Sequence, residues 1–121
     1  MADEAKLQKE YEKNLADATK ASGDEELARQ FAEAAKFMSS LKNREPKVNL
    51  SQSELLELYA HFKESVQNPP VKDAKQPGMF DFEGKAKLSA WKKLAETGIT
   101  PAEAQKKYVE LVESIKQKYG L

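Results

Sequence analysis

Hydrophobic residues recur along most of this chain at the three- and four-residue intervals of an α-helix. The interval is kept over residues 2–20, 27–45, 51–67, 82–97 and 101–119, and the first of these segments is the most sparsely apolar. The predicted buried positions, segment by segment, are Leu7, Tyr11, Leu15 and Ala18; Phe31, Ala34, Met38 and Leu41; Leu55, Leu58, Phe62 and Val66; Gly84, Leu88, Trp91 and Ala95; Ala104, Tyr108, Leu111 or Val112, Ile115 and Tyr119. No segment alternates with a period of two, so the pattern predicts an all-α protein with four core helices.

Capping signals mark the ends of these helices. Residues that start a helix are Asp24, the Ser51-Gln52-Ser53-Glu54 capping box, Asp81, and the Thr100-Pro101-Ala102-Glu103 capping box with its proline at the first helical position. Residues that stop one are Pro46, Asn68-Pro69-Pro70 and Gly98. Residues 67–80, which hold three prolines and a glycine, are expected to form a long ordered loop.

The first segment stands apart from the other four. Its apolar stripe is thin, and Ala21-Ser22-Gly23-Asp24 interrupts the pattern after it. Two interpretations stay open: a partly ordered arm in solvent, or a helix docked on the bundle or on another chain.

Composition narrows the class of protein. A chain of 121 residues suggests one domain, and a net charge of zero argues against a general nucleic-acid binder. The absence of cysteine excludes disulfides and thiolate metal sites. No apolar run approaches the roughly 20 residues of a spanning helix, so stable membrane insertion is not expected. A cytoplasmic location is the expectation.

The charge is nonetheless uneven. Bases outnumber acids in the second half of the chain, and four lysines without an intervening acid lie between Gly84 and residue 93: Lys85, Lys87, Lys92 and Lys93. Together with Trp91 and Tyr108 they predict a basic, aromatic-lined ledge that suits a phosphorylated ligand.

Four positions are the candidates for contacts in such a site. Tyr59 and Lys63 are four residues apart on one predicted helix, so they share a face; the plainer interpretation is a core-edge tyrosine beside a solvated lysine. Lys87 can lay its stem along the Leu88-Trp91 stripe and reach a phosphate. Tyr108 occupies a core position, where a phenol tip commonly finds a polar partner.

Signals for catalysis are missing. The single histidine, His61, has no cysteine and no serine-nucleophile motif to work with. Gly78 to Lys85 imitates a phosphate loop but has the wrong spacing and lacks the Ser or Thr that holds magnesium. We expect no catalytic residue, no metal, no cofactor and no enzyme.

Several motifs in order resemble the acyl-CoA-binding protein family, also called diazepam-binding inhibitor. They are Leu-Tyr-Ala-His-Phe-Lys at residues 58–63, Phe-Asp-Phe-Glu-Gly-Lys-Ala-Lys-Leu-Ser-Ala-Trp at residues 80–91, Ala-Gln-Lys-Lys-Tyr-Val at residues 104–109 and Lys-Tyr-Gly at residues 118–120. The resemblance spans residues 27–120. It implies an up-down-down-up four-helix bundle in residues 24–121, with residues 1–23 as an additional, helical N-terminal extension.

The resemblance also implies the ligand and its contacts. The family binds fatty acyl-CoA, and the matching positions here are Tyr59, Ala60, His61, Phe62, Lys63, Lys87 and Tyr108. The chain departs from the family at Ser39, where a phosphate-binding lysine is usual, and at Leu88, where tryptophan is usual.

The leading hypothesis is a monomeric, non-catalytic carrier that buffers medium- to long-chain fatty acyl-CoA and delivers it to enzymes that use acyl-CoA. The alternative is a helical protein-interaction module that acts through the N-terminal helix and the basic ledge. A third hypothesis attaches the N-terminal helix to a membrane surface.

Overall fold

The structure, a computed structural model, is built from helices. It describes residues 2–121, with side chains from residue 4 onward. The elements are α1 (Ala2–Ser22), α2 (Glu25–Ser40), η1 (Leu41–Asn43), α3 (Gln52–Val66), η2 (Val71–Asp73), α4 (Phe82–Glu96) and α5 (Pro101–Tyr119), where η marks a short 3₁₀ turn. No strand occurs in the part of the chain that the structure describes, so the predicted all-α class is confirmed.

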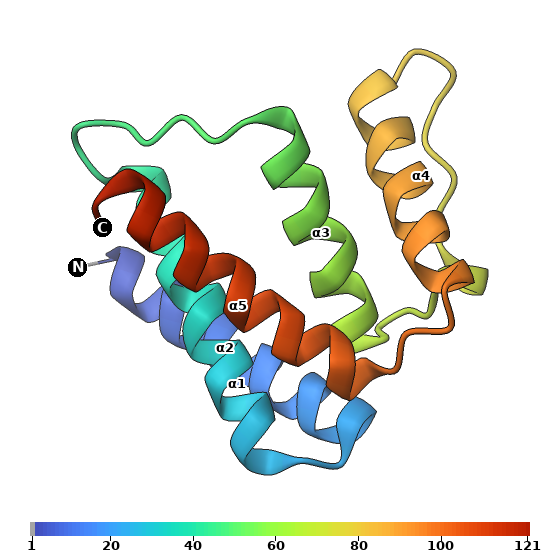
Figure 1. Cartoon of the computed structure of the whole chain (residues 1–121), viewed down its shortest axis with the longest axis horizontal. Helices are drawn as coiled ribbons and strands as arrows, with labels where there is room; N and C mark the ends of the chain where they lie inside the picture. Colours follow the sequence, from blue (N-terminus) through green and yellow to red (C-terminus); the bar gives the residue numbers. More distant parts are fainter. Residues whose placement is uncertain (1) are drawn as a thin grey trace.

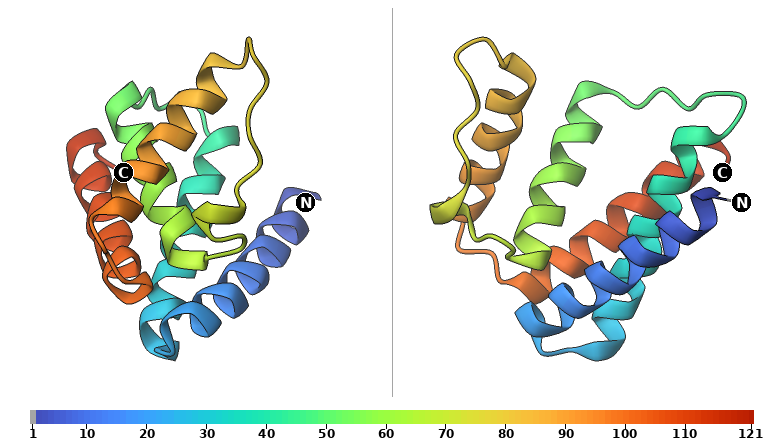
Figure 2. Two further views of the ribbon diagram at one scale, coloured as in Figure 1. Left: turned by 90° about the vertical axis from the view of Figure 1, so that its right-hand side faces the viewer. Right: turned by 180° about the vertical axis from the view of Figure 1, so that it is seen from behind.

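The helices form a bundle with one helix added. In Figure 1, α2 and α5 run towards the same end of the molecule, while α3 and α4 run the opposite way, which is the predicted up-down-down-up order. Helix α5 packs on α2 and α3, and α4 packs chiefly on α3. Helix α1 lies along α2, at the side of the molecule opposite α4, as the view from behind in Figure 2 shows.

The core lies between α2, α3 and α5. Phe31 is fully buried, and its ring centroid lies 5.0 Å from that of Tyr108 and 5.4 Å from that of Phe62. Aromatic pairs at this distance add to the free energy gained by burying their area. The stripe prediction is wrong in one place: Leu55 keeps 47% of its surface exposed and lines a cavity instead of being buried in the core.

The predicted caps are present. Asp24 accepts a hydrogen bond from the backbone N–H of Leu27, and both capping boxes are closed. Asp81 accepts from the N–H of Gly84 at 2.9 Å, and a Cβ at Gly84 would lie 2.3 Å from Asp81 Oδ2. The glycine therefore leaves room for the cap that starts α4.

Helix α1 is docked on the bundle. Ala18 is fully buried in the core cluster and Leu15 packs against that cluster. The buried Gln105 of α5 donates through Nε2 to the carbonyls of Ala18 and Ser65, each at 2.9 Å. A buried amide that joins three helices fixes their relative positions, because leaving its partners unpaired would cost free energy. Of the two interpretations, the docked helix is the one observed.

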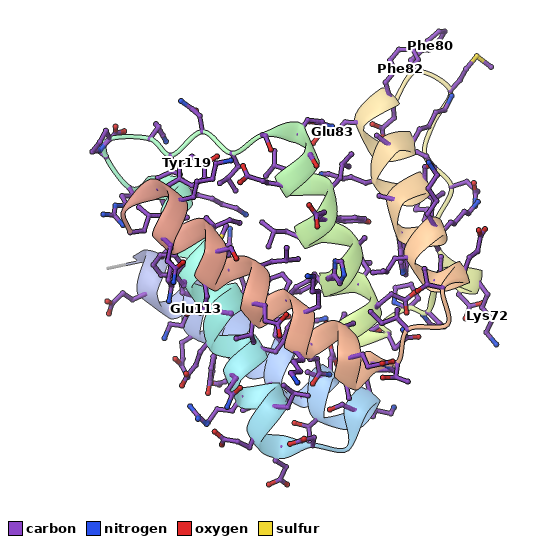
Figure 3. The ribbon with its side chains drawn as sticks, in the orientation of Figure 1. Lys72, Phe80, Phe82, Glu83, Glu113 and Tyr119 are labelled. Carbon is purple, nitrogen blue, oxygen red and sulfur yellow. The ribbon has the colours of Figure 1, made fainter. Side chains whose placement is uncertain are left out.

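The N-terminal end of α4 carries exposed apolar side chains. Met79, Phe80 and Phe82 are 74%, 81% and 72% exposed. Figure 3 shows Phe80 and Phe82 at the outer tip of the molecule, far from Lys72 and from Tyr119. These residues contribute little to the core, although their motif helped to define the resemblance.

Candidate functional site

Two cations and two aromatic rings meet between α3 and α4. Lys63 Nζ lies 5.0 Å from the Trp91 ring centroid, and Lys87 Nζ lies 5.6 Å from that of Tyr59. The two rings are 6.5 Å apart and nearly perpendicular. They line a cavity of about 480 Å³, the charged cleft, whose other walls are Pro69, Ala74, Lys75, Gln76, Pro77, Gly78, Asp81, Gly84 and Leu88.

A buried carboxylate holds the two walls of the charged cleft together. Glu64 on α3 accepts a hydrogen bond from Trp91 Nε1 at 3.2 Å and another from Gln67 Nε2 at 2.5 Å. Only 5% of Glu64 is exposed. No sequence motif pointed to Glu64. A glutamate on the buried side of a helix needs a partner, and that need is the signal that could have revealed it.

The charged cleft is electropositive. Burial lowers the pKa of Lys63, and the nearby positive charge of Lys13 lowers it further. No ion pair of Lys63 is found among the described residues, whereas Lys87 pairs with the exposed Glu83 at 3.1 Å. An anion entering the charged cleft would relieve the unfavourable environment of Lys63.

A larger cavity opens on the other side of Tyr59. It measures about 730 Å³ and is lined by residues of α1, α2, η1, α3 and α5 and by residues 47–50. Its apolar lining consists of Ala35, Met38, Leu41, Val48, Leu50, Leu55, Leu58 and Phe62, with Tyr59 and Tyr108. Its polar lining consists of Glu10, Lys13, Asn14, Ser39, Lys42, Lys47 and Asn49. We call it the apolar cavity.

The structure divides the predicted site residues into four groups. Tyr59 lines both cavities; Phe62 and Tyr108 line the apolar cavity; Lys63 and Lys87 line the charged cleft. Burial raises the pKa of Tyr108, so its phenol stays protonated and neutral.

Ala60 and His61 form the fourth group. Both are buried, and neither lines these two cavities. His61 Nδ1 lies 2.7 Å from the carbonyl oxygen of Glu57, one turn earlier on α3.

The predicted basic ledge is only partly assembled. Of its four lysines, Lys87 lines the charged cleft, while Lys85 donates to the carbonyl of Met79 at 2.7 Å. Lys85, Lys92 and Lys93 line a neighbouring cavity of about 450 Å³, which shares Gln76, Pro77 and Leu88 with the charged cleft but does not include Lys63 or Lys87. Ser39 lines the apolar cavity and Leu88 lines the charged cleft, so both departures from the family lie at the site.

This arrangement suits a ligand that is anionic at one end and apolar at the other. Lysine ammonium groups bind phosphate, and an apolar cavity removes hydrocarbon from water. Within the described residues there is no cluster of three or more His, Asp or Glu side chains that could hold a metal ion. Nor does any described helix have the length and apolarity needed to cross a membrane.

Comparison with known proteins agrees with this chemistry. The profile of the family described as Acyl CoA binding protein matches residues 28–112. The chain is 43% identical over 90 residues to "Acyl-CoA-binding protein homolog 1" of Caenorhabditis elegans, which covers 74% of this chain and 94% of that protein. It is 40% identical to "Acyl-CoA-binding protein homolog" of Manduca sexta over 95 residues, 78% of this chain and 97% of that one.

The relative named "Acyl-CoA-binding protein homolog" from Drosophila melanogaster is 37% identical over 94 residues, which is 78% of this chain and 99% of that protein. Helices α2 to α5 contain the matched region, and α1 lies outside the family profile. The chain belongs to the acyl-CoA-binding protein family.

Proposed function

We propose that this protein binds fatty acyl-CoA reversibly and carries it, without a covalent step, between the enzymes that make and use it. The observation that carries the proposal is the pair of cavities joined at Tyr59, one charged and one apolar. An acyl-CoA ester has the matching pair of parts, a phosphorylated nucleotide and a hydrocarbon chain.

The charged cleft takes the phosphate groups. Lys63 and Lys87 converge there from α3 and α4, and each charge-assisted hydrogen bond is worth about 1.5 to 3 kcal/mol. Glu83 holds Lys87 in the free protein through an exposed ion pair, which is a weak interaction that a phosphate can displace. Tyr59 offers its ring and its hydroxyl between the two cavities.

The apolar cavity takes the acyl chain. Each buried methylene is worth about 0.8 kcal/mol, so affinity should rise with chain length until the cavity is filled. This trend is the basis for proposing medium- to long-chain esters. Phe62 and Tyr108 form its inner wall. Ala60 and His61 contribute by packing α3 so that Tyr59 and Lys63 face the ligand.

The remaining expectations belong to the same proposal. The protein is a cytoplasmic monomer, residues 1–23 are an extension of a binding domain formed by residues 24–121, and enzymes that use acyl-CoA are its partners.

The alternative, an interaction module acting through α1, is less favoured because Leu15 and Ala18 of that helix already pack against the core. Native mass spectrometry separates the two: acyl-CoA bound at one per chain supports the carrier, and a stable dimer without ligand supports the module.

Calorimetry with two ligands tests the phosphate contacts. Lys63→Ala and Lys87→Ala should each weaken binding of palmitoyl-CoA about tenfold or more. Against an analogue that lacks the 3′-phosphate, both losses should shrink, because the group that the lysines bind is absent. Lys92→Ala removes an equal charge from the exposed side of α4 and should change the affinity little.

Two results would overturn the assignment. If wild-type protein binds no acyl-CoA, the proposed function is wrong. If the lysine variants lose the same affinity for both ligands, Lys63 and Lys87 act on another part of the ligand or through stability. Thermal melts of the free variants separate these last two causes.

A further inference from the structure

Helix α1 is fixed against the bundle at several points near the apolar cavity. Asp17 Oδ2 accepts a hydrogen bond from Asn68 Nδ2, beyond the end of α3, at 3.2 Å. Lys36 of α2 donates to Gln8 Oε1 at 3.2 Å and lies 5.6 Å from the ring centroid of Tyr11. Together with the buried contacts of Ala18, these bonds give α1 one position and one rotation about its axis, so the residues that face the cavity are defined.

One side of α1 forms a wall of the apolar cavity. Glu10, Lys13 and Asn14 line it from α1, and Tyr59 lines it from α3. Residues at positions i, i+3 and i+4 lie on the same side of a helix, as this trio requires. Ser39 of α2 lines the same cavity without contributing a charge. The cavity wall that α1 supplies is therefore polar, in contrast to the apolar wall supplied by α3.

Lys13 is the cation of this wall. Its ammonium lies 3.2 Å from Asp17 Oδ2, and 68% of the side chain is exposed. Its charge is also close enough to contribute to the lowered pKa of Lys63 across the site. An exposed pair such as Lys13 and Asp17 contributes little to stability, so Lys13 can turn towards a bound anion without a large cost.

We propose that α1 is part of the ligand-binding site, and that Lys13 on its cavity side is a further cation for the anionic head of the bound acyl-CoA. The proposal rests on the proposed function, because it assumes that acyl-CoA is the ligand. It gives residues outside the family match a definite role: they line one side of the apolar cavity and bring a positive charge near Lys63.

Three single substitutions on α1 test the proposal, with calorimetry of palmitoyl-CoA at low salt as the measurement. Lys13→Ala should weaken binding about threefold to fivefold, the range expected for a partly exposed charge pair. Glu10→Gln removes a negative charge from the same wall and should strengthen binding, by about twofold. Lys9→Ala, at an exposed position of α1 that does not line the cavity, should leave the affinity unchanged.

The dependence of the affinity on salt concentration is a second readout, and a loss of packing would not produce it. The difference between wild type and Lys13→Ala should shrink as the ionic strength rises, since screening shortens the range of charge interactions. Thermal melts of the free proteins check that each variant is folded.

The outcomes distinguish this inference from the proposed function. If wild type binds palmitoyl-CoA and Lys63→Ala weakens binding, but Lys13→Ala behaves like Lys9→Ala at every salt concentration, then α1 takes no part in the site and the inference alone fails. If wild type does not bind, the proposed function fails first. If Lys13→Ala weakens binding equally at low and high salt, the effect does not come from its charge and the inference also fails.

Discussion

The apolar cavity and the charged cleft lie on the two sides of Tyr59, yet they are built differently. The apolar cavity draws its walls from α1, α2, α3, residues 47–50 and Tyr108 of α5, next to the core of the bundle. The charged cleft lies between α3 and α4, and it depends on the packing of Trp91 and on the buried Glu64. Helix α3 is the element that both share.

Under the proposed function, the difference lets one small bundle meet two opposing demands. A hydrocarbon chain is bound by excluding water, which needs enclosed apolar surface. A phosphate is bound by charge, and unpaired charges destabilise a core. The lysines lie in a cleft between α3 and α4 and not in the core around the fully buried Phe31. The charges that a phosphate needs therefore do not disrupt the apolar surface that a hydrocarbon chain needs.

Removing the indole of Trp91 should have the largest effect, because it breaks the charged cleft and spares the apolar cavity. Trp91 is 2% exposed, and Trp91→Ala should lower the free energy of unfolding by about 3 to 5 kcal/mol. Urea denaturation measures the loss. Trp91→Phe keeps a ring between Tyr59 and Lys63, so its free energy of unfolding should fall less than that of Trp91→Ala. An unchanged midpoint in Trp91→Ala would show that α4 is held on α3 by other contacts.

A charge at the mouth of the apolar cavity should have the next largest effect. Leu55 is 47% exposed, so Leu55→Asp should fold normally but lose about tenfold in affinity for palmitoyl-CoA by removing apolar contact. Binding of free coenzyme A, which has no chain, should stay the same. Ser53→Asp adds the same charge at an exposed position of α3 and serves as the control. Equal losses for both ligands would mean that the two cavities do not separate the parts of the ligand.

The smallest expected effect is a pH dependence that belongs to the charged cleft alone. The pKa of Lys63 is lowered by burial and then by Lys13, and a bound phosphate should raise it again. At a pH between the pKa of Lys63 in the free protein and its pKa in the complex, Lys63 has lost its proton in the free protein but keeps it in the complex. Binding should therefore take up protons at alkaline pH, and affinity should fall as the pH rises through the lowered pKa.

Calorimetry in two buffers of different ionisation enthalpy measures the proton uptake. Lys63→Arg should abolish it, since a guanidinium stays charged throughout this range. Leu55→Asp, which alters only the apolar cavity, should retain it. Uptake that persists in Lys63→Arg would assign the titration to another group.

Much of the fold was predictable because its signals are local. A capping box such as Ser51 with Glu54 acts within one turn of helix, and a stripe such as Leu58 and Phe62 reports the buried side of its own helix. The family resemblance likewise rests on short runs of residues. These features were sufficient to predict the helices, the class of fold and a ligand that carries phosphate groups.

Which residues belong to the candidate site depended on how the helices pack against one another. The stripe of α1 is compatible with a free arm, and it is the tertiary contacts of this helix, among them the bonds of Gln105 and Asn68, that place Lys13 at the cavity. Among the four ledge lysines, the rotation of α4 against α3 directs Lys87 inward and leaves Lys92 outside. Periodicity describes one helix at a time, whereas a binding site is defined by the distances between helices, and buried partners such as Glu64 and Trp91 set those distances.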